Sequence, residues 1–251
     1  MIHVIKIGGG VLENEANRDA FLRQFAAIEG PKVLVHGGGR LATTMADRLG
    51  VQTQMIDGRR VTDQETLNIV TMVYGGLVNK QVVAQLHTMG VNAIGLTGVD
   101  GGWMRSVKRP IKNGIDYGFV GDVTQVNGSY LRMLIGMGLT PVIAPITYSA
   151  EGLLLNTNAD TVASMTAISL EPDVQLTFCF EKAGVLSNPD DESSLIPRIT
   201  RESYTQLKAD GIISGGMIPK IDNAFAAIEH GVQSVRITHA SNLQGGTIIV
   251  E

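Results

Sequence analysis

The 251-residue sequence is poor in cysteine, in aromatic residues and in clustered basic charge. Its single cysteine, Cys179, cannot form a disulfide within the chain, which fits a reducing compartment. The net charge is -4, and no run of lysine or arginine is long enough to follow a phosphate backbone, so no nucleic-acid partner is expected. We expect a chain of this composition to act on small molecules.

Targeting signals and metal-ligand patterns are also missing. The first residues read as a strand rather than as a signal peptide, and no apolar run reaches the roughly 18 residues of a membrane span. The five histidines show no metal-ligand spacing, so no protein-bound metal site is predicted. The expectation is a cytoplasmic protein without a membrane partner.

Two apolar runs end in three consecutive glycines: VIKIGGG at residues 4–10 and VLVHGGG at residues 33–39. Short runs of this kind are typical of buried parallel strands, and glycines at their carboxyl ends leave backbone N–H groups open to an anion. Neither run matches the dinucleotide or P-loop pattern. One such loop alone more often marks a tight turn, but two loops, one preceded by Lys6, make an anion site an even alternative.

Strand-like runs alternate with amphipathic stretches along the chain, which predicts an α/β fold with a mainly parallel central sheet. The predicted strands are Val4–Ile7, Lys32–His36, Ala93–Leu96, Pro141–Ala144, Val174–Phe180 and Ser234–Thr238. Residues 52–61 and 99–128 read as hairpins, and Thr62 with Glu65 predicts a capping box. We place the division between two lobes near Pro172, giving residues 1–172 and 173–251.

Four groups of residues could carry chemistry: Lys6 with its glycines, Gly37–Gly39 with Arg60, Asn156–Asp160, and Lys220. Each has a structural alternative, such as a helix N-cap for Asn156–Asp160 or an exposed lysine for Lys220. Together they suit phosphoryl transfer, whose transition state needs cations and backbone N–H groups. No general base is evident, which favours a carboxylate acceptor because that group is already ionised at neutral pH.

These residues resemble the amino acid kinase family, and the resemblance covers essentially the whole chain. It rests on KIGGG at 6–10, VHGGG at 35–39, GRRVT at 58–62, VNK at 78–80, GFVGDV at 118–123, NTNAD at 156–160, GGMIPK at 215–220 and GTIIV at 246–250. The family implies an open αβα sandwich whose amino-terminal lobe binds an acylated amino acid and whose carboxyl-terminal lobe binds ATP. The best-matching members phosphorylate the side-chain carboxylate of N-acetyl-L-glutamate in arginine biosynthesis.

The resemblance also implies roles for single residues. Lys6 and Lys220 would stabilise the transferring phosphoryl group, and Asp160 would organise them. Substrate binding falls to Gly38, Gly39, Arg60 and Asn156, with Arg60 on the α-carboxylate. Contacts to ATP, whose Mg²⁺ is held mainly by phosphates, fall to Gly8, Gly9, Glu181, Lys182, Gly184, Leu186, Ile212 and Ser214. Glu181 departs from the family, which usually has a small hydroxyl residue and then Asp there.

Several alternatives stay open. The acyl group could be another one, such as succinyl, because its recognition depends on pocket shape that no motif encodes. A non-catalytic metabolite sensor on the same fold is a different class, and a dinucleotide-dependent oxidoreductase is disfavoured by the missing glycine fingerprint. Arginine-inhibited family members carry an amino-terminal extension, and this sequence begins at its first strand. We therefore expect a homodimer insensitive to arginine.

Overall fold

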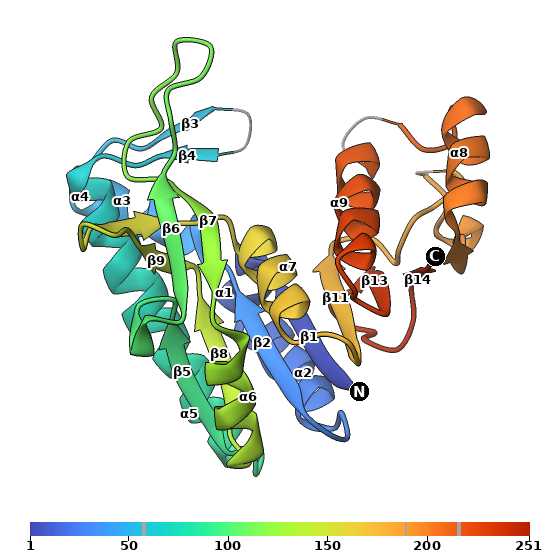
Figure 1. Ribbon diagram of the computed structural model, residues 1–251, viewed down its shortest axis with the longest axis horizontal. Helices are drawn as coiled ribbons and strands as arrows, with labels where there is room; N and C mark the ends of the chain where they lie inside the picture. The colour runs from blue at the N-terminus through green and yellow to red at the C-terminus, as the bar shows by residue number, and fades with distance from the viewer. Residues whose placement is uncertain (57–58, 189, 215–216) are drawn as a thin grey trace.

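An eight-stranded, mainly parallel sheet forms the centre of the computed structural model, which describes residues 1–56, 59–188, 190–214 and 217–251 (Figure 1). The strand order is β12-β14-β13-β11-β1-β2-β8-β5, and only the β13–β14 pair is antiparallel. These strands are β1 (Ile2–Ile7), β2 (Lys32–His36), β5 (Ala93–Thr97), β8 (Thr140–Ala144), β11 (Val174–Phe180), β12 (Arg198–Ile199), β13 (Ser234–His239) and β14 (Thr247–Ile249). All six predicted strands are confirmed.

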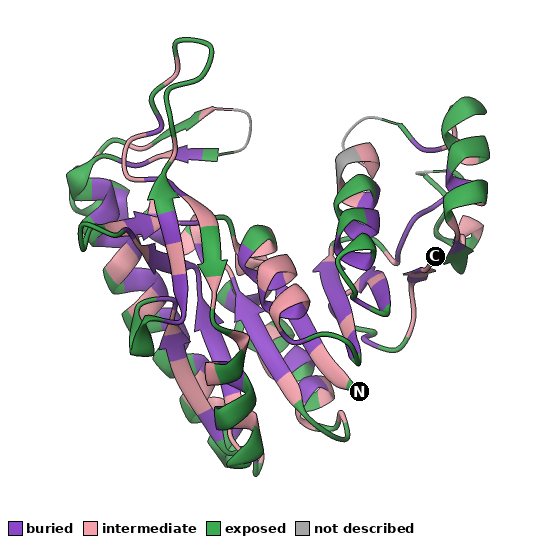
Figure 2. Cartoon of the chain, in the orientation of Figure 1, coloured by how far each residue is buried: buried purple, intermediate pink, exposed green. Residues whose placement is uncertain are grey.

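Helices cover both faces of this sheet. They are α1 (Gly9–Glu13), α2 (Glu15–Ala26), α3 (Gly39–Arg48), α4 (Gln64–Val70), α5 (Asn79–Thr88), α6 (Gly128–Gly136), α7 (Ala159–Ser169), α8 (Arg201–Ala209) and α9 (Met217–Glu229). A π-helix, Thr71–Val78, joins α4 to α5, and short 3-10 turns lie at Asp100–Gly102 and Glu192–Ser194. Figure 2 shows the central strands buried between exposed outer helix surfaces.

Successive residues of each central strand enter different cores, as the pleat requires. Val4 of β1 packs in the core that contains side chains of α6, α7 and α9, whereas Ile5 and Ile7 pack in the core that contains those of α2, α3 and α5. The predicted αβα sandwich is therefore confirmed. The same alternation puts Lys6 on the α7 and α9 face.

Smaller sheets stand over one end of the central sheet (Figure 1). The strands β3 (Gln54–Ile56) and β4 (Arg59–Val61) form the first predicted hairpin, and β6 (Met104–Lys108) with β7 (Gly121–Val126) form the second. Strands β9 (Ile146–Tyr148) and β10 (Leu154–Asn156) complete a four-stranded sheet with β6 and β7. Gly58 of the GRRVT motif and Gly215 and Gly216 of GGMIPK lie outside the described residues.

The predicted capping box at Thr62 and Glu65 is wrong by one residue. Helix α4 is capped by Asp63, whose carboxylate accepts a hydrogen bond from the Thr66 backbone N–H at 2.8 Å. The Thr62 hydroxyl instead accepts a hydrogen bond from the Asn156 amide at 3.0 Å and donates one to the Arg60 carbonyl at 3.1 Å. An aspartate one position later thus frees Thr62 to join the hairpin to β10.

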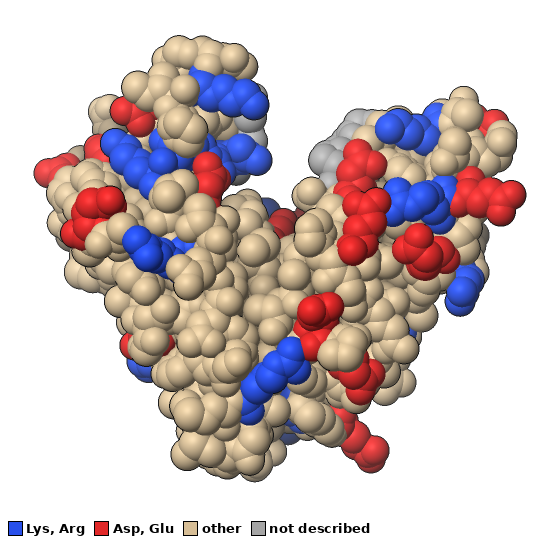
Figure 3. Space-filling model, viewed as in Figure 1, with Lys and Arg blue, Asp and Glu red and all other residues tan. Residues whose placement is uncertain are grey.

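The predicted lobe boundary falls in the connection from α7 to β11. The sheet itself is continuous there, because β11 pairs with β1 along its length. Figure 3 nevertheless shows a hollow between two arms, one carrying the hairpins and the other carrying α8 and α9. The division into residues 1–172 and 173–251 stays a prediction.

Candidate active site

The two glycine loops meet at the carboxyl ends of β1 and β2. The Gly37 N–H donates a hydrogen bond to the Ile7 carbonyl at 3.0 Å. A Cβ on Gly9 would lie 2.9 Å from the Gly38 backbone nitrogen, and one on Gly38 would lie 2.8 Å from the Tyr74 ring. These approaches are too close for any side chain, so glycine is required for the backbones to touch.

A buried histidine holds the second loop in place. His36 Nδ1 contacts the Gly37 carbonyl at 2.8 Å, and its Nε2 lies 3.1 Å from the Asn79 side-chain amide. The tautomer with a proton on Nδ1 satisfies both contacts, whereas a second proton would face the amide donor. Burial lowers the pKa of His36 to about 4, and the nearby Lys80 charge acts in the same direction. The prediction that His36 is structural fits this arrangement.

A cavity of about 200 Å³ opens beside the second glycine loop, and all four predicted substrate-binding residues line it: Gly38, Gly39, Arg60 and Asn156. Its other lining residues include Tyr74, Arg59, Arg109, Thr157 and Asn158. The amino ends of α3 and α7 both reach this cavity, and their positive dipole ends favour an anion there.

Arg60 is the most constrained cation of this cavity. Its side chain is only 8% exposed, and its Nη2 donates hydrogen bonds to the Gly39 carbonyl at 2.7 Å and to the Thr43 hydroxyl at 2.8 Å. Its Nη1 is buried without a partner. An unpaired guanidinium nitrogen is costly, and a ligand carboxylate would satisfy it.

The three predicted catalytic residues converge next to this cavity. Asn158 caps α7 by accepting hydrogen bonds from the backbone N–H groups of Asp160 and Thr161 at 2.8 and 3.1 Å. The cap fixes Asp160 in the first turn, where its Oδ1 lies 2.8 Å from Lys6 Nζ. Because the two groups are out of line for a hydrogen bond, the contact is an ion pair.

Lys220 reaches the same point from the first turn of α9. Its Nζ lies 3.9 Å from the centre of the Phe180 ring, and Lys6 Nζ lies 5.8 Å from that centre. Burial lowers the pKa of Lys220, and the Lys6 charge lowers it further, while Asp160 and Glu181 oppose the shift. Two ammonium groups therefore share a half-buried site with one carboxylate, an arrangement that an added anion would relieve.

The predicted nucleotide-binding residues divide between two adjoining cavities. The larger, about 340 Å³, is lined by Lys6, Gly8, Glu181, Lys182, Gly184 and Lys220 among others. The smaller, about 100 Å³, is lined by Lys182, Gly184, Leu186, Ile212 and Ser214 with further apolar residues. Gly9 is not among the described residues that line either one, and its backbone lies against Gly38. Glu181 is 85% exposed and pairs with Arg40 at 3.5 Å.

Sequence reasoning missed Tyr74 and Arg109 as lining residues of the substrate cavity. Tyr74 comes from the π-helix, and burial raises its pKa while the adjacent Arg60 opposes that shift. Arg109 follows β6, and its backbone N–H donates to the Val120 carbonyl at 2.7 Å. Only the pairing of distant segments brings these residues to the cavity, so no local pattern could reveal them.

Within the described residues, no group of three or more His, Cys, Asp or Glu side chains could hold a metal ion. Cys179 is buried, and burial raises the pKa of its thiol to about 12. In the same part of the chain, no helix is both long enough and apolar enough to cross a bilayer.

Three relatives of this chain carry the same name, acetylglutamate kinase. The chain is 55% identical to an acetylglutamate kinase of Phocaeicola vulgatus, over 98% of this chain and 97% of that protein. It is 56% identical to one of Bacteroides thetaiotaomicron (96% and 94%) and 40% identical to one of Methanopyrus kandleri (98% of each).

Solved structures share the fold. A Streptococcus mutans UA159 protein superposes with a TM-score of 0.77 at 29% identity, covering 99% of this chain and 98% of that one. Carbamate kinase from Giardia lamblia bound to AMP-PNP gives a TM-score of 0.70 at 15% identity, with 100% and 98% covered. The model of the amino acid kinase family matches residues 1–239. This chain belongs to the amino acid kinase family.

Proposed function

We propose that the chain transfers the γ-phosphoryl group of ATP to the side-chain carboxylate of N-acetyl-L-glutamate, which gives N-acetyl-L-glutamyl phosphate and ADP. The observation that carries the proposal is that Lys6 and Lys220 line the cavity that contains Gly8, while Asp160, which pairs with Lys6, directly follows residues that line the cavity of Arg60. Relatives that are more than half identical to this chain over nearly its full length carry the name of that activity.

In this proposal Arg60 binds the α-carboxylate of the amino acid. Its Nη1 lacks a partner, and its Nη2 is tied to Gly39 and Thr43, so the guanidinium is already oriented. Asn156 has one amide hydrogen bond to Thr62 and keeps its carbonyl oxygen for a substrate N–H donor. Binding the backbone end of the amino acid here leaves its side chain to reach towards Asp160.

The transfer step needs charge neutralisation more than proton transfer. A side-chain oxygen attacks the γ-phosphorus, and the bond from that phosphorus to the β,γ-bridging oxygen breaks. The carboxylate is ionised at neutral pH, so the transfer requires no general base. Lys6 and Lys220 stabilise the charge on the moving phosphoryl group, and Asp160 keeps their ammonium groups together.

ATP fits the residues at its proposed site. The glycine loops present bare backbone next to Lys6, and the smaller cavity beside Leu186 and Ile212 is apolar enough for a base. When bound, MgATP supplies the phosphoryl group, and its Mg²⁺ is held mainly by the phosphates. We further propose that the enzyme acts in the cytoplasm as a homodimer, which light scattering would test.

The experiment is ATP consumption with Mg²⁺ and hydroxylamine trapping of the acyl phosphate. N-acetyl-L-glutamate, L-glutamate and L-aspartate are compared side by side. The proposal predicts a hydroxamate from the acylated glutamate and none from the two free amino acids. If N-acetyl-L-glutamate yields no hydroxamate, this proposal fails, and a metabolite sensor on a kinase fold is the alternative to test by ligand binding.

A further inference from the structure

The substrate cavity holds more positive charge than the α-carboxylate of N-acetyl-L-glutamate can neutralise. Three arginines line it, Arg59, Arg60 and Arg109, and no Asp or Glu is among its described lining residues. Arg109 is paired with Asp122, which leaves two positive charges at this end of the site. The α-carboxylate of N-acetyl-L-glutamate neutralises only one of these two charges. The side-chain carboxylate of the substrate lies at the other end of the site, near Lys6 and Lys220.

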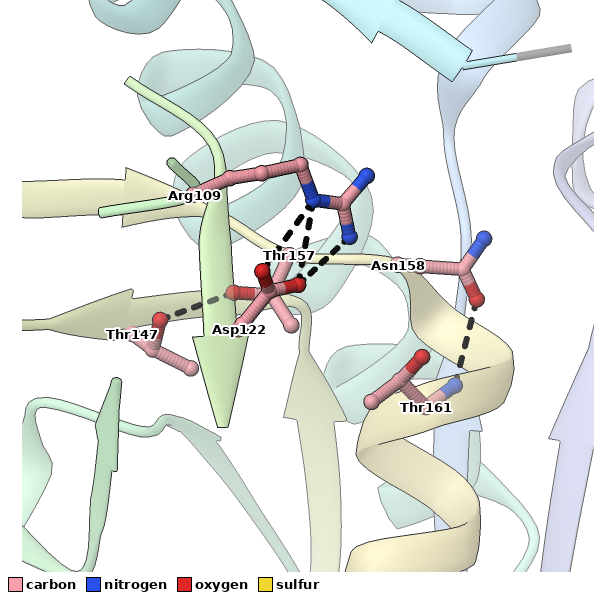
Figure 4. Close-up of polar contacts among 6 residues, drawn as sticks. All are labelled: Arg109, Asp122, Thr147, Thr157, Asn158 and Thr161. Atoms are coloured by element: carbon pink, nitrogen blue, oxygen red, sulfur yellow. Dashed lines mark hydrogen bonds and ion pairs between the residues drawn. The ribbon is translucent and has the colours of Figure 1, made fainter. Parts of the chain in front are cut away.

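Arg109, like Arg60, is held by hydrogen bonds to its neighbours. Its Nε donates to both carboxylate oxygens of Asp122 at 3.1 and 3.2 Å, and its Nη2 donates to Oδ1 at 2.5 Å. The guanidinium also lies 5.5 Å from the centre of the Tyr117 ring. Figure 4 shows the third nitrogen, Nη1, pointing away from Asp122. That nitrogen is buried without a partner.

The two unpartnered guanidinium nitrogens come from different elements of the fold. Arg60 lies on β4 against the second glycine loop, whereas Arg109 follows β6 and its backbone N–H donates a hydrogen bond to the Val120 carbonyl. Val120 bridges to Asn156, so Arg109 is attached to the wall that carries Asn156. A ligand held by both arginines therefore presents an acceptor to each of two walls.

We propose that Arg109 reads the acyl group, and that the site prefers a glutamate whose N-acyl chain ends in a carboxylate over N-acetyl-L-glutamate. This inference rests on the proposed function and names the substrate class more closely. An acetyl carbonyl would give Arg109 one neutral acceptor. A terminal carboxylate would give Arg109 a charged acceptor, and hence a charge-assisted hydrogen bond. It would also neutralise the positive charge of the cavity that the α-carboxylate leaves uncompensated. Asp122 is a positioning residue, because it acts only by holding Arg109.

The test compares kcat/KM for three substrates by the hydroxamate assay: N-acetyl-L-glutamate, N-succinyl-L-glutamate and the neutral terminal amide of the latter. The wild-type protein is expected to prefer the succinyl substrate over both others by about tenfold or more, as a charged hydrogen bond provides. Preference for the acetyl substrate, or equal use of the succinyl compound and its amide, would overturn the proposal.

The Arg109→Met variant separates recognition from folding. In this variant the ratio of kcat/KM for the succinyl substrate to kcat/KM for the acetyl substrate should fall by about tenfold or more. Lys108→Met is the matched control, because it removes one positive charge from the last residue of β6, next to Arg109 and outside the residues that line the cavity. It should leave the ratio unchanged. Equal losses on both substrates would contradict the assignment of Arg109.

The wild-type comparison stands even if the Arg109 variant does not fold, since it needs no substitution. The outcomes also separate this inference from the proposed function. Hydroxamate formation with the acetyl substrate favoured refutes the inference and leaves the kinase activity in place. No hydroxamate from any of the three substrates refutes the kinase activity.

Discussion

Among single residues, Lys220 differs from a surface lysine in its burial and its neighbours. Its pKa is lowered chiefly by burial and further by Lys6, so its ammonium is lost on raising the pH at a value below the ordinary 10.5. The pH dependence of kcat/KM for ATP reports the pKa values of groups in the free enzyme. We therefore expect kcat/KM to fall at alkaline pH with an apparent pKa below 10.5. The fall in kcat should lie at higher pH, because bound phosphates stabilise the ammonium.

Substitution tests the same lysine. Lys220→Ala should lower kcat by about a hundredfold or more with little change in KM, since the contact strengthens as charge develops on the phosphoryl group. Lys220→Arg keeps a charge that does not titrate in this range, so any activity it retains should lose the part of the alkaline fall that Lys220 causes. An unchanged kcat in Lys220→Ala would show that the lysine has no part in the transfer.

Arg60 should affect binding rather than the rate of transfer. Arg60→Ala removes the group proposed to hold the α-carboxylate, which is remote from the reacting oxygen. We expect KM for the amino acid to rise by about tenfold or more, with a smaller change in kcat. Arg60→Lys should not restore KM, because an ammonium cannot bond Gly39, Thr43 and a carboxylate with the same geometry. A melting curve of each variant controls for loss of fold.

At the scale of elements, the end of β2 is attached to α5 through the buried pair His36 and Asn79. The pKa of His36 is about 4 in the folded protein and 6.5 in the reference state, so the unfolded chain binds more protons between these values. Folding stability should therefore be present above pH 6.5 and fall as the pH drops towards 4, by about 3 kcal/mol from this residue.

Urea unfolding at a series of pH values measures this loss. His36→Gln cannot titrate in this range, so its free energy of unfolding should change less steeply with pH. His3, whose pKa is also lowered, mainly by burial, contributes in the same direction, and His3→Gln measures its separate share of the slope. Equal slopes for His36→Gln and the wild-type protein would contradict the account.

Sequence patterns predict those elements whose signal is local. The six central strands are continuous apolar runs, so burial on both faces marks them directly. The cap of α4 was misplaced because Thr62 and Asp63 are adjacent and both can cap a helix; only the contact with Asn156, far along the chain, decides between them. Arg109 reaches the cavity through the pairing of β6 with β7, whose bulge cannot be read from the sequence.

For the molecule as a whole, the proposed reaction depends on groups from both sides of the division near Pro172. Lys6 and Asp160 precede it and Lys220 follows it, yet Lys6 and Lys220 both approach the Phe180 ring at the end of β11. The continuous pairing of β1 with β11 holds these positions in one sheet. The structure thus brings the proposed acceptor site and ATP site to one edge of the sheet.

The most direct measurement follows an oxygen atom through the reaction. N-acetyl-L-glutamate carrying a heavy oxygen isotope in its side-chain carboxylate is incubated with the protein, MgATP and hydroxylamine. Hydroxylamine cleaves the acyl phosphate at its carbonyl carbon, so phosphorus NMR should detect inorganic phosphate that contains one heavy oxygen. Phosphate without the label would mean that water, not the carboxylate, attacks ATP, and would contradict the proposed transfer.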